Sequence, residues 1–257
     1  MVYIHNIDPV LLYLGPIEIR YYGLVYVLGF VFAYFIIKQL AKKKTIALTE
    51  DELESLLLYL AVGLLLGARI FYFLFYNFAL FIEEPFQIFK IWEGGMSFHG
   101  AFIGIVIAGL LFCRKYKKEF YNIADIVIVP AVLALGFGRI ANFINGELYG
   151  RPTTLPWAVD FGDDIPRHPS QLYEAAKNFV IFGVLWILKD KNLRKGTLFW
   201  TFITLYGIFR FCIEFFREPD PQVGFVLFNT FTMGQVLTGI MAIVGGSVLL
   251  HWHLKRK

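Results

Sequence analysis

The chain has 257 residues, of which 58% are hydrophobic, 18% aromatic and only 17% charged, and its formal net charge is +4. An average globular chain is about half apolar and about a quarter charged, so this composition excludes a water-soluble globular protein. The mean hydropathy of +0.61 indicates a helical membrane protein instead, and two cysteines are too few for a disulfide framework.

Seven apolar stretches are long enough to predict membrane-spanning helices. In chain order they cover about Tyr21 to Ile37, Leu56 to Phe78, Phe98 to Phe112, Ile123 to Phe143, Tyr173 to Leu188, Thr197 to Phe216 and Met233 to Trp252. Little sequence remains outside them, so residues 1–257 are predicted to form a single all-α transmembrane domain of seven helices. The longest polar segment, at about residues 145–171, is rich in Gly, Pro, Asp and Arg and is predicted to be a functional external loop.

The basic residues predict how this bundle is oriented. Fifteen of the 24 Lys and Arg residues lie in four clusters at alternate span ends, within residues 38–44, 114–118, 189–195 and 255–257. Cytoplasmic loops of membrane proteins carry an excess of Lys and Arg, so the N-terminus is predicted outside and the C-terminus in the cytoplasm. Because the clusters are spread over all these loops, they indicate no nucleic-acid partner.

Four cationic side chains remain within or close to the spans, where an Arg near the bilayer centre costs roughly 2.5 to 3.5 kcal/mol on insertion scales. They are Arg69, Arg139, Lys177 and Arg210. Counting about 1.5 Å per helical residue places the three arginines in the outer half of the bilayer. Arg69 lies beside a G-x-x-x-G pattern at residues 63–67, which favours a structural role in close helix packing. Lys177 is interpreted as a side chain that extends its ammonium group to the membrane interface.

Further polar side chains are predicted at the same outer level. Tyr22 and His99 begin two spans at the outer surface, and Asn142 and Glu147 lie near the outer end of another. These positions predict a polar cavity that opens outward. One alternative is that Arg139 forms only a helix-end tie with Glu147.

The sixth predicted span adds three residues to this cavity. Tyr206, Arg210 and Glu214 follow one another at intervals of four, so they share one face of a helix. The alternative here is a simple intrahelical ion pair between Arg210 and Glu214, which would not explain the neighbouring tyrosine.

Several arginines without an acidic metal cluster suit an anionic ligand, and the abundant anion of the outer leaflet is a phospholipid phosphate. The sequence has no CxxC, HExxH or carboxylate cluster, so neither a metal nor a cofactor is expected. Ser97 lies near His99, but no serine sits in a nucleophile elbow. The pattern favours direct transfer of a lipid group to an external acceptor. An outer-leaflet phospholipid transporter or flippase is the alternative, although the cytoplasmic halves of the spans are almost purely apolar.

Six stretches carry a resemblance to a known family. They are RYYGLVYVLGF (20–30), GARIFYFLFY (67–76), WEGGMSFHGAFIG (92–104), GRIANFINGELYGR (138–151), RHPSQLYEA (167–175) and YGIFRFCIEFFREPD (206–220). Together they resemble the phosphatidylglycerol:prolipoprotein diacylglyceryl transferases of bacteria. Ala101 and Ala141 stand where many members have Gly, which exchanges one small residue for another.

The resemblance implies a transferase of the bacterial cytoplasmic (inner) membrane whose active site faces the outer leaflet. Its substrates would be phosphatidylglycerol and prolipoprotein signal peptides with a lipobox cysteine. The diacylglyceryl group would pass to the cysteine thiol, forming a thioether and releasing glycerol phosphate. This is the first step of bacterial lipoprotein maturation, and the nucleophile belongs to the substrate.

The resemblance also implies roles for single residues. Arg139 and Arg210 match the family's essential arginines and are expected to bind the phospholipid headgroup and the departing phosphate. His99 matches the histidine of the HG motif and is expected to act as general base or to stabilise the thiolate, with Glu147 as the alternative. The positions that would shape the site and bind substrate are Tyr22, Asn142, Gly150, Tyr206 and Glu214.

Overall fold

The computed structural model describes residues 2–15, 17–90, 94–218, 224–227 and 230–255. Residues 92–93 and 219–220, at the ends of two of the family motifs, lie outside this part of the chain, as do the basic residues Arg256 and Lys257. The described residues fall into two compact units, the first formed by residues up to Ile36 and from Val127 onward, and the second by Ile37–Ile126. Each unit is described by itself.

All seven predicted helices are present. They are α1 (Tyr21–Lys43), α2 (Glu50–Phe75), α4 (Phe98–Tyr116), α5 (Phe120–Ile144), α6 (Ser170–Leu188), α7 (Thr197–Ile213) and α8 (Met233–Leu254). Two short helical segments that the sequence analysis did not predict follow α2, namely α3 (Phe78–Glu83) and η1 (Pro85–Phe89). The largest boundary differences are six residues each: α1 ends six residues after the predicted Ile37, and α2 begins six residues before the predicted Leu56.

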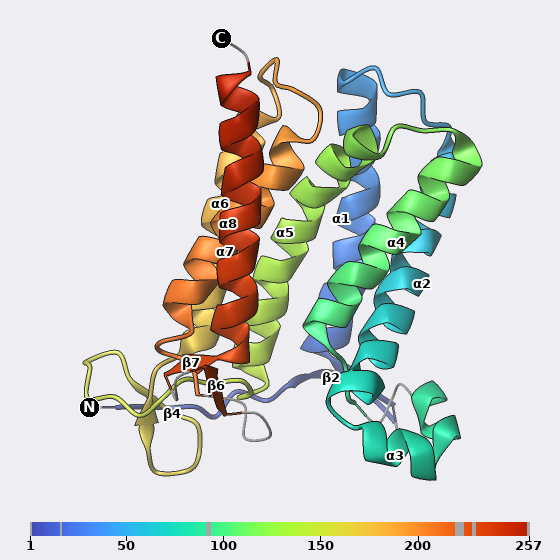
Figure 1. Cartoon of the computed structure of the whole chain (residues 1–257). Helices are drawn as coiled ribbons and strands as arrows, with labels where there is room; N and C mark the ends of the chain where they lie inside the picture. Colours follow the sequence, from blue (N-terminus) through green and yellow to red (C-terminus); the bar gives the residue numbers. More distant parts are fainter. Residues whose placement is uncertain (1, 16, 91–93, 219–223, 228–229, 256–257) are drawn as a thin grey trace. The chain divides into compact units, whose positions relative to one another are not determined.

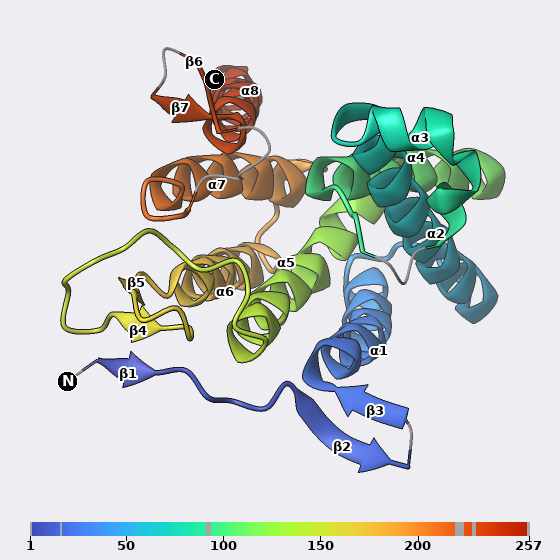
Figure 2. The same ribbon diagram turned by 90° about the horizontal axis from the view of Figure 1, so that it is seen from below.

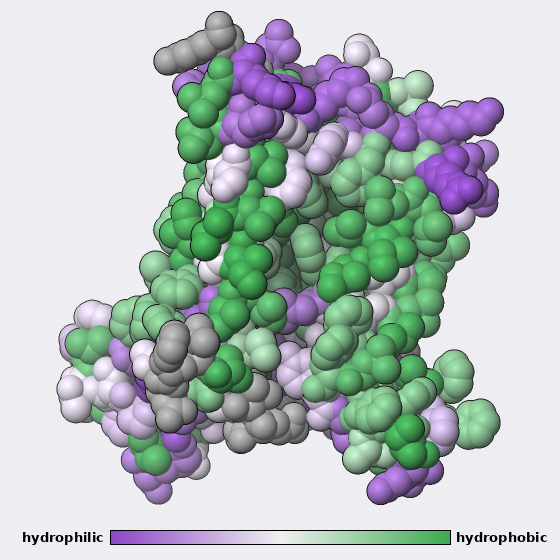
Figure 3. Space-filling model, in the orientation of Figure 1, coloured by the Kyte–Doolittle hydropathy of each residue, from purple (hydrophilic) through white to green (hydrophobic). Residues whose placement is uncertain are grey.

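In the described residues, five helices are long and apolar enough to cross a membrane, namely α1, α2, α4, α5 and α8. The shorter α7, with 17 residues, is also apolar. Apolar side chains such as Phe35, Phe75 and Ile243 are more than 60% exposed on these helices, as expected where lipid replaces water. On the face shown in Figure 3, hydrophobic residues cover the middle of the helices and hydrophilic residues gather near their ends. The chain is therefore a helical, multi-pass membrane protein.

The first unit packs α5, α6, α7 and α8 in succession. The ring of Phe179 on α6 lies 5.4 Å from that of Phe137 on α5, α6 contacts α7, and α7 and α8 lie side by side (Figure 1). Gly207 allows this last approach, because a Cβ there would lie 2.6 Å from the backbone nitrogen of Ala242. This succession brings polar side chains of α5, α6 and α7 together.

Short strands occupy the non-helical parts of the first unit. Strands β2 (Val10–Leu14) and β3 (Ile17–Arg20) form an antiparallel hairpin directly before α1 (Figure 2). Strand β1 (Tyr3–Ile4) pairs with β4 (Val159–Asp160), which also pairs with β5 (Pro166–Arg167). A third pair, β6 (Phe225–Leu227) with β7 (Phe231–Thr232), precedes α8. The sequence analysis predicted none of these strands, because two to five residues are too few to show an alternating pattern.

The second unit is built on the contact between α2 and α4. Helix α2 starts with a capping box, in which the Thr49 hydroxyl accepts from the Glu52 N–H and the Glu52 carboxylate accepts from the Thr49 N–H. Gly63 and Gly67 then meet Gly104 of α4, where an added Cβ would collide with backbone atoms of the other helix. The G-x-x-x-G pattern is thus confirmed as a close-packing surface.

Candidate functional site

The centre of the site is the carboxylate of Glu174 on α6, which is 2% exposed. Its Oε2 lies 2.9 Å from Lys177 Nζ, one turn further along α6, and 3.4 Å from Arg139 Nε on α5. Its Oε1 lies 3.1 Å from Arg210 Nε on α7. One buried carboxylate therefore binds cations from three consecutive helices.

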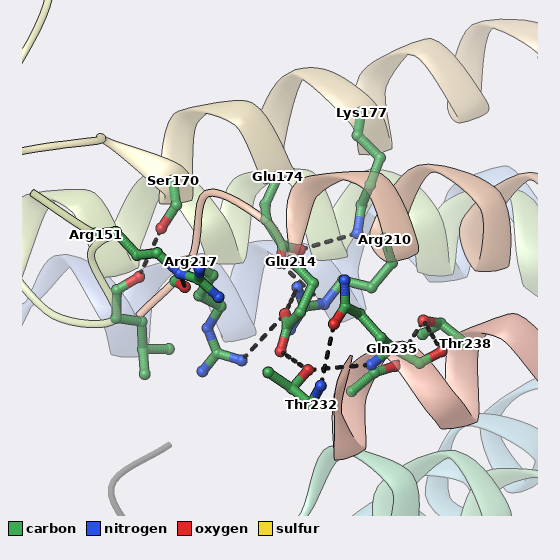
Figure 4. A network of polar contacts seen from close by, with 12 residues as sticks. Arg151, Ser170, Glu174, Lys177, Arg210, Glu214, Arg217, Thr232, Gln235 and Thr238 are labelled. Carbon is green, nitrogen blue, oxygen red and sulfur yellow. Dashed lines mark hydrogen bonds and ion pairs between the residues drawn. The ribbon is translucent and has the colours of Figure 1, made fainter. Parts of the chain in front are cut away.

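A second carboxylate continues the contacts along α7. Arg210 Nη1 forms an ion pair with Glu214, one turn later on the same helix. Arg217 approaches the same carboxylate at 3.9 Å, and Thr232 Oγ1 donates a hydrogen bond of 2.8 Å to Glu214 Oε1. Because Thr232 is also the N-cap of α8, these contacts connect the C-terminal end of α7 to the start of α8 (Figure 4).

We call these six ionisable residues the ion network: Arg139, Glu174, Lys177, Arg210, Glu214 and Arg217. In the described residues, Arg139, Lys177 and Arg210 face the two carboxylates, which leaves a formal excess of one positive charge among these five side chains. Burying charge without compensation is costly. The network is therefore a place where an anion would be stabilised, and arginine forks suit phosphate oxygens geometrically.

Lys177 corrects one of the sequence predictions. The side chain does not extend to the membrane interface, because it is buried, with 5% of its surface exposed. Besides its ion pair with Glu174, its Nζ lies 3.9 Å from the centre of the Tyr206 ring. These two contacts compensate for the loss of water, so the lysine belongs to the ion network. Tyr206 is itself buried beside it.

Glu174 is the residue of the ion network whose contacts the sequence analysis missed. The two alternatives considered there involved Glu147 and Glu214 as partners of the arginines. The Arg210–Glu214 pair is present, but the ion pair of Arg139 is with Glu174 and not with Glu147. One signal was available in the sequence: Glu174 stands three positions before Lys177 at the start of an apolar stretch. A charged residue in a membrane helix normally has an oppositely charged partner.

Glu147 lies just beyond α5, among amide side chains. Its Oε1 accepts hydrogen bonds from Asn142 Nδ2 at 2.7 Å and from Asn145 Nδ2 at 3.2 Å. Asn142 is buried and Glu147 is exposed, so the amide anchors a carboxylate that still reaches the surface. At the start of α1, the hydroxyl of Tyr22 lies 3.2 Å from that of Tyr26.

Gly150 joins the long polar loop between α5 and α6 to the end of α7. Its N–H donates to the carbonyl of His168 at 2.8 Å, and the N–H of Arg151 donates to the carbonyl of Phe216 at 2.9 Å. A Cβ on Gly150 would overlap the Phe216 carbonyl and lie 2.7 Å from the Cβ of His168. The absence of a side chain at Gly150 therefore allows the loop to lie against the segment that carries Arg217.

His168 is held inside this loop. Its Nδ1 lies 3.1 Å from the hydroxyl of Tyr173, which accepts a hydrogen bond of 2.7 Å from the indole N–H of Trp157. Burial lowers the pKa of His168 below its usual value of 6.5, because the charged imidazolium loses solvation. The tyrosine can thus donate its proton to a neutral imidazole.

His99 and Arg69 belong to the second unit. His99 is the second residue of α4, two positions after the N-cap Ser97, whose Oγ accepts from the Gly100 N–H at 3.2 Å. Ser97 is therefore used as a helix cap. The structure brings Tyr206, Arg139, Arg210 and Glu214 together in the first unit.

Arg69 has the structural role predicted for it. The side chain is 5% exposed, and its guanidinium donates to five backbone carbonyl groups. These belong to Gln87, Ile88, Lys90, Gly94 and Gly95. Arg69 therefore holds η1 and the residues Lys90, Gly94 and Gly95 against α2. In the described residues, no group of three or more His, Cys, Asp or Glu side chains could hold a metal ion.

Comparisons with known proteins agree with the resemblance in the sequence motifs. The family described as "Prolipoprotein diacylglyceryl transferase" matches residues 9–252. A phosphatidylglycerol--prolipoprotein diacylglyceryl transferase of Geobacter sulfurreducens is 48% identical over 243 residues, which cover 93% of each chain. The enzymes of the same name from Desulfotalea psychrophila and Legionella pneumophila (strain Lens) are 42% and 45% identical, and the alignments cover at least 95% of every chain involved.

Proposed function

Since the chain belongs to the prolipoprotein diacylglyceryl transferase family and transfers a diacylglyceryl group from phosphatidylglycerol to prolipoprotein, we propose that the ion network binds the phosphate of the lipid. The observation that carries this proposal is the formal excess of one positive charge that Arg139, Lys177 and Arg210 leave around the carboxylates of Glu174 and Glu214. A phosphodiester brings one negative charge to this excess. It also provides oxygens for the N–H donors of the two guanidinium groups.

The same positive charges stabilise the departing phosphate monoester more than they stabilise the phosphodiester of the bound lipid. The thiol sulfur of the lipobox cysteine attacks the diacylglyceryl carbon that is bonded to the phosphate oxygen. A C–S bond forms, the C–O bond breaks, and the electron pair leaves with glycerol phosphate. A phosphate monoester carries close to two negative charges at neutral pH, one more than the phosphodiester. Arg139 and Arg210 therefore stabilise charge that grows during the reaction, which lowers the barrier.

The thiol must also lose its proton. An unperturbed cysteine has a pKa of about 8.5, so only a small fraction is thiolate at neutral pH. His99 of the HG motif is the general base or thiolate-stabilising group of this proposal, and Glu147 is the alternative. Tyr22, Asn142, Gly150, Tyr206 and Glu214 shape the lipid site. The ion pair of Glu214 with Arg210 and its hydrogen bond from Thr232 support this role for Glu214.

The proposal includes a topology. All seven long helices cross the bacterial cytoplasmic (inner) membrane as one transmembrane domain, with the N-terminus outside and the C-terminus in the cytoplasm. Helix α6 has 19 residues, which at ~1.5 Å each give roughly 28 Å, close to the ~30 Å hydrocarbon thickness of a bilayer. The ion network then lies toward the outer leaflet, where the prolipoprotein cysteine is delivered.

The experiment follows the label of phosphatidylglycerol radiolabelled in its diacylglyceryl glycerol. The purified protein in detergent is mixed with this lipid and a synthetic lipobox peptide, and a peptide with Ser in place of Cys is the control. We expect label on the cysteine peptide alone, together with release of unlabelled glycerol phosphate. Equal labelling of the two peptides would contradict the thiol as acceptor, and wild-type turnover after replacement of both Arg139 and Arg210 would contradict the assigned phosphate site.

A further inference from the structure

We infer that Glu174 is a positioning residue for the transfer reaction, which holds Arg139 and Arg210 at a fixed spacing and orientation. This inference rests on the proposed function of the ion network as the phosphate site. It concerns a residue that does not itself touch the lipid: all its ion pairs in the described residues are with the side chains of the network.

The first support is that the two carboxylate oxygens divide the arginines between them. Oε1 binds Arg210 and Oε2 binds Arg139, each through Nε of the guanidinium. A guanidinium has five N–H donors in a rigid fork. Because Nη1 of Arg210 is already paired with Glu214, Nη2 of Arg210 and the terminal nitrogens of Arg139 are the donors that this arrangement offers to phosphate oxygens.

The second support is the place of Glu174 among the helices. Arg139 is on α5, Arg210 is on α7, and Glu174 lies on α6 between them (Figure 4 shows its contacts with α7). The two arginines are 71 positions apart in the sequence, so their spacing depends on how these helices pack. A single carboxylate that touches both sets that spacing directly.

The third support is Lys177, which holds Glu174 itself. The lysine lies one turn along the same helix, 2.9 Å from Oε2, and its Nζ is also against the Tyr206 ring. Both side chains of the Glu174–Lys177 pair are 2% exposed. A contact within α6 therefore holds the carboxylate in addition to its contacts with the arginines, as expected of a group that supports a binding site.

The test is the kinetics of the variant Glu174→Gln, which keeps the shape of the side chain and removes its charge. With the arginines no longer held, we expect kcat to fall about 100-fold, as for a displacement of reacting groups by about 1 Å. The formal positive excess rises by one at the same time. KM for phosphatidylglycerol should therefore not increase, and inhibition by glycerol phosphate should become stronger.

The matched control is Glu52→Gln, which removes the carboxylate of an ion pair with Lys118 at the start of α2. Gln also completes a capping box, so this variant should retain wild-type kcat and KM. Wild-type kcat and KM in Glu174→Gln would overturn the inference. So would a variant whose folded molecules keep the wild-type kcat and KM while a smaller fraction of the protein folds. If Glu174→Gln does not fold, Glu174→Asp replaces it. Asp keeps the charge but is one methylene shorter, so kcat should fall in the same way, and wild-type kcat would again overturn the inference.

A double variant separates positioning from simple charge balance. Glu174→Gln with Lys177→Met restores the original formal charge without restoring the contacts to the arginines. We expect kcat to stay low in the double variant, and recovery to the wild-type value would overturn the positioning role. A separate variant tests the proposal that the ion network binds the phosphate. If that proposal is wrong, Arg139→Lys remains fully active, whatever the activity of the Glu174 variants.

Discussion

Arg139 is the residue at which the chemistry of the cation matters most. It is the most exposed of the three cations around Glu174, with 19% of its side chain accessible compared with 9% for Arg210 and 2% for Lys177. A partly accessible guanidinium can still reach a ligand, whereas Lys177 is fully occupied by Glu174 and Tyr206. Arg139 is therefore the arginine we expect to contact the phosphate most directly.

The first prediction is that Arg139→Lys leaves folding nearly intact and lowers kcat by about 100-fold, the loss typical of removing one donor to a developing oxyanion. Lysine keeps the positive charge but has a compact ammonium in place of the planar fork. The measurement is the transfer assay together with the thermal unfolding of the variant in detergent. Normal turnover in a folded variant would show that a point charge is sufficient.

His168 carries the second prediction at this scale, which concerns pH. Its folded-state pKa is lowered by burial, so the unfolded chain binds a proton more readily than the folded chain. The stability that the neutral imidazole contributes is complete above the ordinary pKa of 6.5 and is lost as the pH falls below it, toward the lowered folded value.

The measurement is the unfolding temperature of the wild type and of His168→Asn between pH 8 and pH 5. Asn retains an acceptor for the Tyr173 hydroxyl but does not titrate. We expect the wild type to lose stability relative to the variant at the acidic end. Parallel curves for the two proteins would show that His168 titrates normally in the fold.

At the scale of elements, the pair α2 and α4 shows how small residues replace large ones in helix packing. Without water, apolar side chains alone provide little drive for two helices to associate in lipid, so close backbone approach and dispersion matter more. Gly63 and Gly67 face Gly104 directly, and a Cβ on Gly104 would lie 2.9 Å from the Cα of Gly67 and collide with the Gly63 carbonyl. The contact therefore has no room for one methyl group.

The third prediction is that Gly104→Ala lowers the stability of the protein by about 1 to 3 kcal/mol, as is typical of overpacking. Gly183→Ala is the matched control, because a Cβ on this α6 glycine meets nothing within 4 Å, and alanine favours a helix over glycine by about 1 kcal/mol. The two variants are compared by thermal unfolding in the same detergent. Equal stability would contradict the close contact.

At the scale of the whole molecule, the distribution of charge along the chain predicts which loops face which side of the membrane. Residues 189–195 carry four cations between α6 and α7, and residues 145–171 form the long polar loop between α5 and α6. The positive-inside rule places the first in the cytoplasm. We therefore expect the second loop, which contacts the segment that carries Arg217, to lie outside.

The fourth prediction tests this topology with single cysteines in a background that lacks Cys113 and Cys212. Thr154→Cys lies in the long loop and Lys191→Cys in the basic one, and both positions are exposed. The reagent is a maleimide that cannot cross the cytoplasmic membrane, added to intact cells whose outer membrane has been made permeable. It should label the cysteine at position 154. It should label the cysteine at position 191 only after the cytoplasmic membrane has been disrupted. The reverse pattern would invert the proposed orientation.

Much of the fold could be predicted from local patterns. Apolar runs of about 20 residues reveal helices in lipid directly, because every backbone polar group in the bilayer must be satisfied within the helix. All seven predicted helices are present, and Arg210 was placed with Glu214 because residues four apart share a helix face. A structural role for Arg69 was predicted from the neighbouring glycines, but the side chain performs it differently, by binding backbone carbonyl groups between Gln87 and Gly95.

Contacts between helices could not be predicted in this way. The sequence determined that Arg139 and Arg210 are costly charges in apolar stretches, but only the packing of α5, α6 and α7 decided that Glu174 binds both of them. Lys177 points inward for the same reason, since its partners are a carboxylate on its own helix and a ring on the next. The residues that share one face of a helix follow from their spacing in the sequence. The residues that this face contacts on another helix depend on how helices distant in sequence pack together.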